Sequence, residues 1–176
     1  MVSDRYIATE PWKADRPENL VVCCSDGRWH EQVEDFIRAQ VSERADMYVV
    51  PGGPAAFDIW NSSFDESQAL EKSFRFLVEH HSLSTIWLIA HQDCAYYRAK
   101  QRSAGDASLR RRQYTDLDRA EQLILEWYPR LDAQKVYASL LDGGQVLFEK
   151  VLSPAEVGWS RGGQVLQISD SPGNTG

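Results

Sequence analysis

Short apolar runs alternate with longer segments in which apolar residues recur at helical spacing. The runs are bounded by turn-forming residues, a pattern typical of strands buried in a sheet. They predict strands at 20–24, 47–50, 85–90, 136–141, 145–151 and 165–168. Asp142-Gly143-Gly144 separates the fourth run from the fifth, so we expect these two strands to form an antiparallel hairpin.

The segments between the runs predict helices, because their apolar residues lie three and four positions apart. We expect helices over 29–45, from Asp65 to 81, and from Leu117 to Tyr128, with a basic, irregular stretch before the last one. Strands that alternate with helices imply right-handed crossovers and a mainly parallel sheet. The predicted fold is therefore α/β, with a mainly parallel sheet flanked by helices. We expect the order 2-1-3-4 with an antiparallel edge strand 5, because an order 2-1-3 brings the ends of the first and third strands together.

Length, charge and hydropathy narrow the class of protein. The 176 residues predict a single α/β domain, 1–176, with an N-terminal arm at 1–18 and a C-terminal extension at 153–176. A formal net charge of −7 argues against nucleic-acid binding. No apolar run approaches the ~20 residues needed to span a bilayer, and no signal peptide is visible. We therefore expect no membrane partner and a cytoplasmic location.

Cysteine and histidine residues follow two of the predicted strands. Cys24 ends the first strand, and His91 and Cys94 come directly after the third. With the strand order 2-1-3, these side chains meet in the crevice at the carboxyl ends of the strands. Thiolate and imidazole ligands select zinc, and three ligands leave the fourth position open, as in catalytic zinc sites. Cys23 points to the opposite face of its strand, so we expect it in the core.

The spacing of His91 and Cys94 also suits chelation. If a helix begins directly after Ala90, both side chains lie on one face of its first turn. The three cysteines are too few for a disulfide framework, which agrees with reduced thiols that are available for a metal. Taken singly, these residues can also be buried thiols and a hydrogen-bonded core histidine. Their combination favours a metal site.

Cys24-Ser25-Asp26-Gly27-Arg28 and His91-Gln92-Asp93-Cys94, each after a strand, resemble the motifs of the β-class carbonic anhydrases, and the likeness spans most of the chain. This resemblance implies that Cys24, His91 and Cys94 hold Zn²⁺. It implies that Asp26 and Arg28 are a catalytic carboxylate–guanidinium pair, in which Asp26 either takes the fourth zinc position or pairs with Arg28. It also implies a homodimer and reversible hydration of carbon dioxide to bicarbonate by zinc-bound hydroxide.

The chain departs from the family pattern near the site. Val50-Pro51-Gly52-Gly53-Pro54 replaces the usual Arg-Asn-Ala-Gly, and Ala95-Tyr96-Tyr97 follows Cys94 where glycine is usual. A second reading is therefore a zinc hydrolase for another small electrophile, such as carbonyl sulfide or carbon disulfide. A third is a non-catalytic homologue in which Asp26 is a permanent fourth ligand. Asp26 and Arg28 can also be a helix cap and a surface ion pair.

Several other residues have both a functional and a structural reading. Gly52 and Gly53 predict a turn with positive φ, or a close approach of the backbone to the metal pocket. The insertion at 57–68 can cover the site. We also predict that a basic segment is either solvated or an anion site, and that four aromatic residues contact a partner. Among the histidines, we expect His30 and His80 to face solvent and His81 to be hydrogen-bonded at the core edge. The basic segment comprises Arg98, Lys100, Arg102, Arg110, Arg111 and Arg112, and the four aromatic residues are Trp12, Trp29, Trp60 and Phe64.

Overall fold

A five-stranded sheet forms the centre of the molecule, and the computed structural model describes residues 5–58 and 64–152. The strands are β1 Asn19–Cys24, β2 Asp46–Val50, β3 Thr85–His91, β4 Asp132–Leu140 and β5 Val146–Lys150. They lie in the order β2-β1-β3-β4-β5, with parallel pairing throughout except for antiparallel β4 and β5. The predicted α/β fold, strand order and edge hairpin are confirmed. The strand expected at 165–168 lies outside the described residues.

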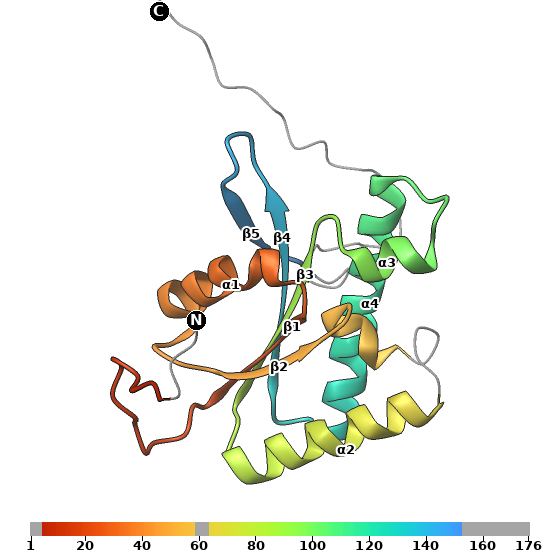
Figure 1. Ribbon diagram of the computed structural model, residues 1–176. Coiled ribbons are helices and arrows are strands. Elements are labelled where there is room, and N and C mark those ends of the chain that lie inside the picture. The colour runs from red at the N-terminus through yellow and green to blue at the C-terminus, as the bar shows by residue number, and fades with distance from the viewer. Residues whose placement is uncertain (1–4, 59–63, 153–176) are drawn as a thin grey trace, which may run out of the picture.

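Helices cover both faces of the sheet (Figure 1). α1, His30–Phe36, continues as the π-helical turn η2, Ile37–Val41, and packs on one face. α2, Phe64–His81, and α4, Asp106–Trp127, pack on the other face. The remaining helical segments are η1 Gly27–Trp29, η3 Gly53–Phe57 and α3 Ala95–Lys100. None of the helices within the described ranges is long and apolar enough to cross a membrane.

Two of the predicted helices have different bounds in the structure. The helix expected over 29–45 ends at Val41, where Ser42 becomes extended. The stretch before Leu117 is not irregular, because it contains α3 and the first turns of α4. Buried positions on α4 recur every three or four residues, but two of them are the polar Gln113 and Asp116. These polar residues hid the helical period in the sequence.

The side chains of β1 alternate between the two faces of the sheet. Leu20 and Val22 belong to the core that α2 and α4 cover, whereas Val21 and Cys23 belong to the core under α1. Cys24 continues the first series and leaves the strand on the side of η3, α3 and α4. The prediction that Cys23 lies in the core is confirmed, since its exposed fraction is 2%.

The loop after β2 passes very close to the end of β1. Gly52 and Gly53 both have positive φ, 79° and 55°. A Cβ atom at Gly53 would lie 2.9 Å from the backbone C of Cys23 and the backbone N of Cys24. Glycine is therefore required here for both conformation and space, and it lets η3 pack against β1.

We expect Gly53→Ala to destabilise the fold more than Gly143→Ala does. Gly143 also has positive φ, 89°, but an added Cβ there meets nothing within 4 Å. The left-handed conformation alone costs alanine roughly 1–2 kcal/mol. The backbone clash at position 53 adds about 1–3 kcal/mol, typical of overpacking. Urea denaturation measures both free energies of unfolding, and equal losses in the two variants would contradict the close approach.

Candidate metal centre

Three buried side chains, Cys24, His91 and Cys94, form a group that could hold a metal ion. Cys24 is the last residue of β1, His91 is the last residue of β3, and Cys94 is the N-cap of α3. Their ligand atoms all lie within 4.8 Å of one another, and the two Sγ atoms are 3.8 Å apart. The strand order therefore brings together the three residues that the sequence singled out.

The imidazole of His91 presents a lone pair to this group. Its Nδ1 lies 2.8 Å from the carbonyl of Gln92, so this nitrogen carries the proton and donates it. The other nitrogen, Nε2, is buried and has no hydrogen-bond partner within the described part of the chain. A buried acceptor without a partner is costly, and a metal ion would satisfy it. His91 is therefore not the fully hydrogen-bonded core histidine of the structural reading.

His91 and Cys94 do not share one helical turn, so that expectation is wrong. β3 pairs with β4 as far as His91 opposite Ala138, and the strand thus extends one residue further than predicted. The chain then turns through Asp93, which has a φ of 55°, and α3 begins at Ala95. These two ligand candidates therefore lie at a strand end and at a helix cap.

The two thiols share a site that favours one negative charge. The Cys94 thiol, hydrogen-bonded to Cys24, lowers the pKa of Cys24 against the opposing effect of burial, and the backbone N–H groups of Gly52 and Asp26 add to the lowering. The Gly52 N–H lies 3.3 Å from the Cys24 sulfur. The same Cys24 thiolate, together with burial, raises the pKa of Cys94. Burial raises the pKa of the separate Cys23 thiol to about 12, so Cys23 stays neutral.

Asp26 and Arg28 pair at the edge of this group. Arg28 donates from Nη2 to Oδ2 of Asp26 at 2.6 Å and from Nε to Oδ1 at 3.0 Å. The Asp26 carboxylate also caps η1 by accepting the backbone N–H of Arg28. The guanidinium group holds the pKa of Asp26 at about 2. Asp26 is thus both a helix cap and the partner of Arg28 in an ion pair, as the structural interpretation predicts. It lies outside the group formed by the three ligand candidates.

Arg28 also contacts the turn between His91 and Cys94, the other two ligand candidates. Its guanidinium lies 3.3 Å from the Asp93 carboxylate and 3.2 Å from the Asp93 carbonyl. Arg98 donates to the other carboxylate oxygen of Asp93 at 2.7 Å and pairs with Asp106 at 2.6 Å. A row of alternating charges therefore connects η1 with α3 and α4.

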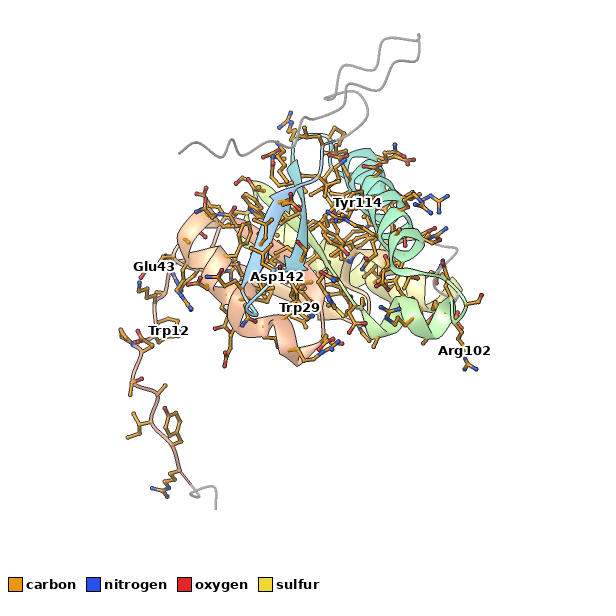
Figure 2. All side chains as sticks on the ribbon, turned by 90° about the horizontal axis from the view of Figure 1, so that it is seen from above. Trp12, Trp29, Glu43, Arg102, Tyr114 and Asp142 are labelled. Atoms are coloured by element: carbon orange, nitrogen blue, oxygen red, sulfur yellow. The ribbon has the colours of Figure 1, made fainter. Side chains whose placement is uncertain are left out.

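Within the basic segment, Arg98, Arg110 and Arg112 pair with carboxylates. Arg112 and Arg119 both bind the buried carboxylate of Asp58 at 2.6 Å, and Arg110 lies 3.4 Å from Glu149. Figure 2 shows Arg102 at the outer corner of the molecule, far from Trp29 in that view. These contacts favour a charged helix surface over a free anion site.

The histidine and tryptophan predictions have mixed outcomes. His81 Nδ1 lies 2.5 Å from the Asp46 carboxylate, as expected for a hydrogen-bonded residue at the core edge, and His80 is exposed. His30 is half-buried, not solvent-facing, because its Nε2 lies 3.2 Å from the Cys24 carbonyl. Trp29 is 6% exposed and its ring lies 4.8 Å from that of His91, so the expected partner contact through Trp29 is wrong.

The other residues of the partner and cover predictions are only partly described. Trp12 is 87% exposed on the arm. Trp60 lies outside the described residues, and α2 begins at Phe64. Of the insertion at 57–68, Phe57 and Asp58 are buried, and 59–63 lie outside the described ranges. The proposed cover is therefore not tested.

Sequence reasoning missed the part that α4 plays beside the site. Gln113 donates to the carbonyl of His91 at 2.7 Å, and the Tyr97 hydroxyl donates to Asp116 at 2.8 Å. A polar residue inside the buried stripe of α4 was the only available signal. A cavity of about 260 Å³ also lies against Cys94, with Tyr97, Leu109, Gln113 and Tyr137 among its walls. The cavity can admit a small molecule.

Comparison with known proteins agrees with this arrangement. A family model described as "Putative carbonic anhydrase" matches residues 15–146, which contain all three ligand candidates. The chain belongs to this carbonic anhydrase family. No curated protein sequence is significantly similar to this family member.

Solved structures of β-carbonic anhydrases share the fold of this divergent carbonic anhydrase family member. The Streptococcus mutans enzyme is 16% identical, covering 81% of this chain and 87% of its own, with a TM-score of 0.50. Isoform I of Trichomonas vaginalis is 14% identical to this chain. The match covers 81% of this chain and 87% of that enzyme, with a TM-score of 0.50. CafD of Aspergillus fumigatus is 11% identical to this chain. The match covers 82% of this chain and 95% of CafD, with a TM-score of 0.51.

We expect Arg28→Gln to raise the pKa of Asp26 from about 2 toward the ordinary aspartate value of about 4, because the charge that stabilises the carboxylate is removed. Carboxyl NMR titration of metal-free protein measures this pKa. Since the folded-state pKa is depressed, the pair stabilises the fold above pH ~4, and this contribution is lost as the pH falls through about 2. Arg38→Gln, which affects only an exposed pair with Glu34, is the control. An unchanged Asp26 pKa in Arg28→Gln would contradict the assignment.

Proposed function

We propose that Cys24, His91 and Cys94 bind a zinc ion. The observation that carries this proposal is the buried, unpartnered Nε2 of His91 beside two sulfur atoms 3.8 Å apart. Two sulfur ligands on a tetrahedral zinc ion lie about 3.8 Å apart when each Zn–S bond is ~2.3 Å long. A set of two thiolates and one imidazole also matches the ligand preference of zinc. The need for reduced thiols fits a cytoplasmic location.

The reaction that this site supports best is the reversible hydration of carbon dioxide to bicarbonate. Zinc lowers the pKa of a bound water to about 7, and this is the chemistry that the metal supplies. Arg28 keeps Asp26 ionised, so its carboxylate can accept a hydrogen bond and orient the nucleophile at the open ligand position. Because both carboxylate oxygens bind Arg28, Asp26 favours an open site over a closed structural one.

A second candidate substrate class is another small uncharged electrophile, such as carbonyl sulfide or carbon disulfide. The cavity beside Cys94 could admit such a molecule, since Tyr97, Leu109 and Tyr137 form the apolar part of a wall that also carries charged side chains such as Asp93 and Arg98. The same nucleophile would attack either class of substrate. Assaying both classes on one preparation distinguishes the two activities.

Purified, reduced protein should contain about one zinc ion per chain and hydrate carbon dioxide in stopped-flow measurements. Cys94→Ser should lose most of its zinc and its activity, because a hydroxyl replaces a metal-binding thiolate. Cys23→Ala is the matched control, since this neighbouring thiol faces the other core, and it should retain the metal. A zinc-free wild-type protein would rule out the proposal. Full zinc occupancy without hydration would leave the second substrate class or a structural site.

We also propose that the protein assembles as a homodimer through the β2 edge of the sheet. Met47 and Val49 on this edge strand are 42% and 39% exposed. The arm carries the exposed Trp12, and Arg44, just before β2, pairs with Asp15 of the arm at 2.5 Å. Figure 2 shows Trp12 on the arm outside the main body. Met47, Val49 and Trp12 are thus exposed apolar side chains that a second copy can cover.

Light scattering coupled to size exclusion should give the mass of a dimer for the wild-type protein. Val49→Asp should dissociate it, because a carboxylate would be buried in the interface. Leu147→Asp is the control, since Leu147 is 38% exposed on the opposite edge strand, β5. A monomeric wild-type protein, or dissociation by Leu147→Asp alone, would be incompatible with a β2 interface.

A further inference from the structure

Gln113 is a buried polar residue in the middle of α4. Its side chain is 3% exposed and donates from Nε2 to the backbone carbonyl of His91 at 2.7 Å. An apolar residue would fill the same place without the cost of burying an amide. The pairing between β1 and β3 ends at Val22 opposite Leu88, short of His91. The amide of Gln113 therefore supplies a donor to the His91 backbone beyond the end of that ladder.

Other contacts fix the remaining freedom of this histidine. The backbone N–H of Gln92 donates to Ala138 at 2.8 Å, and the Gln92 side chain accepts the N–H of Leu140 at 3.0 Å. Trp29 packs against the imidazole ring. With its backbone held by β4 and Gln113, and its ring held by Trp29 and the Gln92 carbonyl, His91 directs Nε2 toward the two sulfur atoms.

The same face of α4 also holds the Cys94 side of the site. Leu109 lies four residues before Gln113 and packs in a cluster with Cys24 and Cys94. Asp116 lies three residues after Gln113 and accepts the hydroxyl of Tyr97, a residue of the short helix that Cys94 caps. Residues at these spacings share one helix face. A single rigid helix thus contacts the turn from His91 to Cys94 at both ends.

We propose that Gln113 is a positioning residue of the metal centre, holding His91 at the distance from Cys94 that zinc requires. This inference rests on the proposed function. Groups that orient metal ligands typically change metal affinity by about 10–100-fold when they are removed. Gln113 acts through the backbone of His91 and does not touch the metal itself.

The test compares Gln113→Glu and Gln113→Met with the wild-type protein. Ionised glutamate keeps the shape of the side chain but replaces the donor nitrogen by an acceptor oxygen, and methionine keeps the length without any donor. Gln122→Met, at an exposed position of the same helix, is the control. Zinc affinity is measured by chelator competition, and ligand geometry by the absorption spectrum of the cobalt-substituted protein. Both are measured below the melting temperature of each variant.

We expect both Gln113 variants to bind zinc about 10–100-fold more weakly and to alter the cobalt spectrum, with Gln122→Met unchanged. Tight wild-type binding with unchanged affinity and spectrum in the variants would overturn the role of Gln113 alone. A wild-type protein that binds neither zinc nor cobalt would overturn the proposed metal centre as well. If a variant does not fold, Gln113→Asn, which withdraws the amide by one methylene, is judged by the same two criteria.

Discussion

The candidate metal centre depends on the direct parallel pairing of β1 with β3. This pairing places the carboxyl ends of two strands that are more than sixty residues apart in sequence side by side, at the same edge of the sheet. Cys24 and His91 are the last residues of these strands and lie just beyond the last β1–β3 pair, Val22 opposite Leu88, so the sheet brings them close together and contacts beyond the ladder fix their final positions. Parallel neighbours require a crossover connection, and η3 and α2 lie within it. The hydrogen-bonded ladder thus fixes the direction and spacing of the two strands whose ends carry Cys24 and His91.

Charge at the site is balanced by neighbouring groups. The Cys24 sulfur accepts backbone hydrogen bonds, and Arg28 neutralises Asp26 while it reaches Asp93. The Asp93 contact is exposed and individually weak, but Arg98 and Asp106 extend it into a network. The network joins the loop after β1 to the helices after β3. Both segments adjoin the ligand candidates, because Cys24 directly precedes the first, and His91 and Cys94 precede the second.

The sequence was sufficient for the features that follow from periodicity. The two-residue period of β1 separated Cys24 from Cys23, and the alternation of strands and helices predicted a mainly parallel sheet. The contributions of Trp29 and Gln113 were not predictable in this way. Trp29 follows a turn and belongs to no apolar stripe, and Gln113 stands beside a run of arginines that suggested a solvated segment. Their importance comes from contacts between segments far apart in the chain, which no local pattern records.

The loop from His91 to Cys94 differed from expectation for a geometric reason. β4 extends the pairing of β3 to His91, so the helix cannot begin until the chain has turned. Asp93 makes that turn with a left-handed backbone, which a non-glycine residue adopts at a cost. Glycine would be easier to accommodate there, but it would remove the carboxylate that binds both Arg28 and Arg98. The left-handed residue at this turn is thus one whose side chain connects η1 with α3.

The short distance between the Cys24 and Cys94 sulfur atoms has a consequence for the chemical durability of the protein. At 3.8 Å, the two atoms would need to approach by only roughly 2 Å to reach the length of a disulfide bond. The lowered pKa of Cys24 favours its thiolate, the form that reacts with oxidants. The features that prepare the pair for a metal therefore also make the empty pair prone to oxidative cross-linking. A bound metal ion would protect its own sulfur ligands from oxidation.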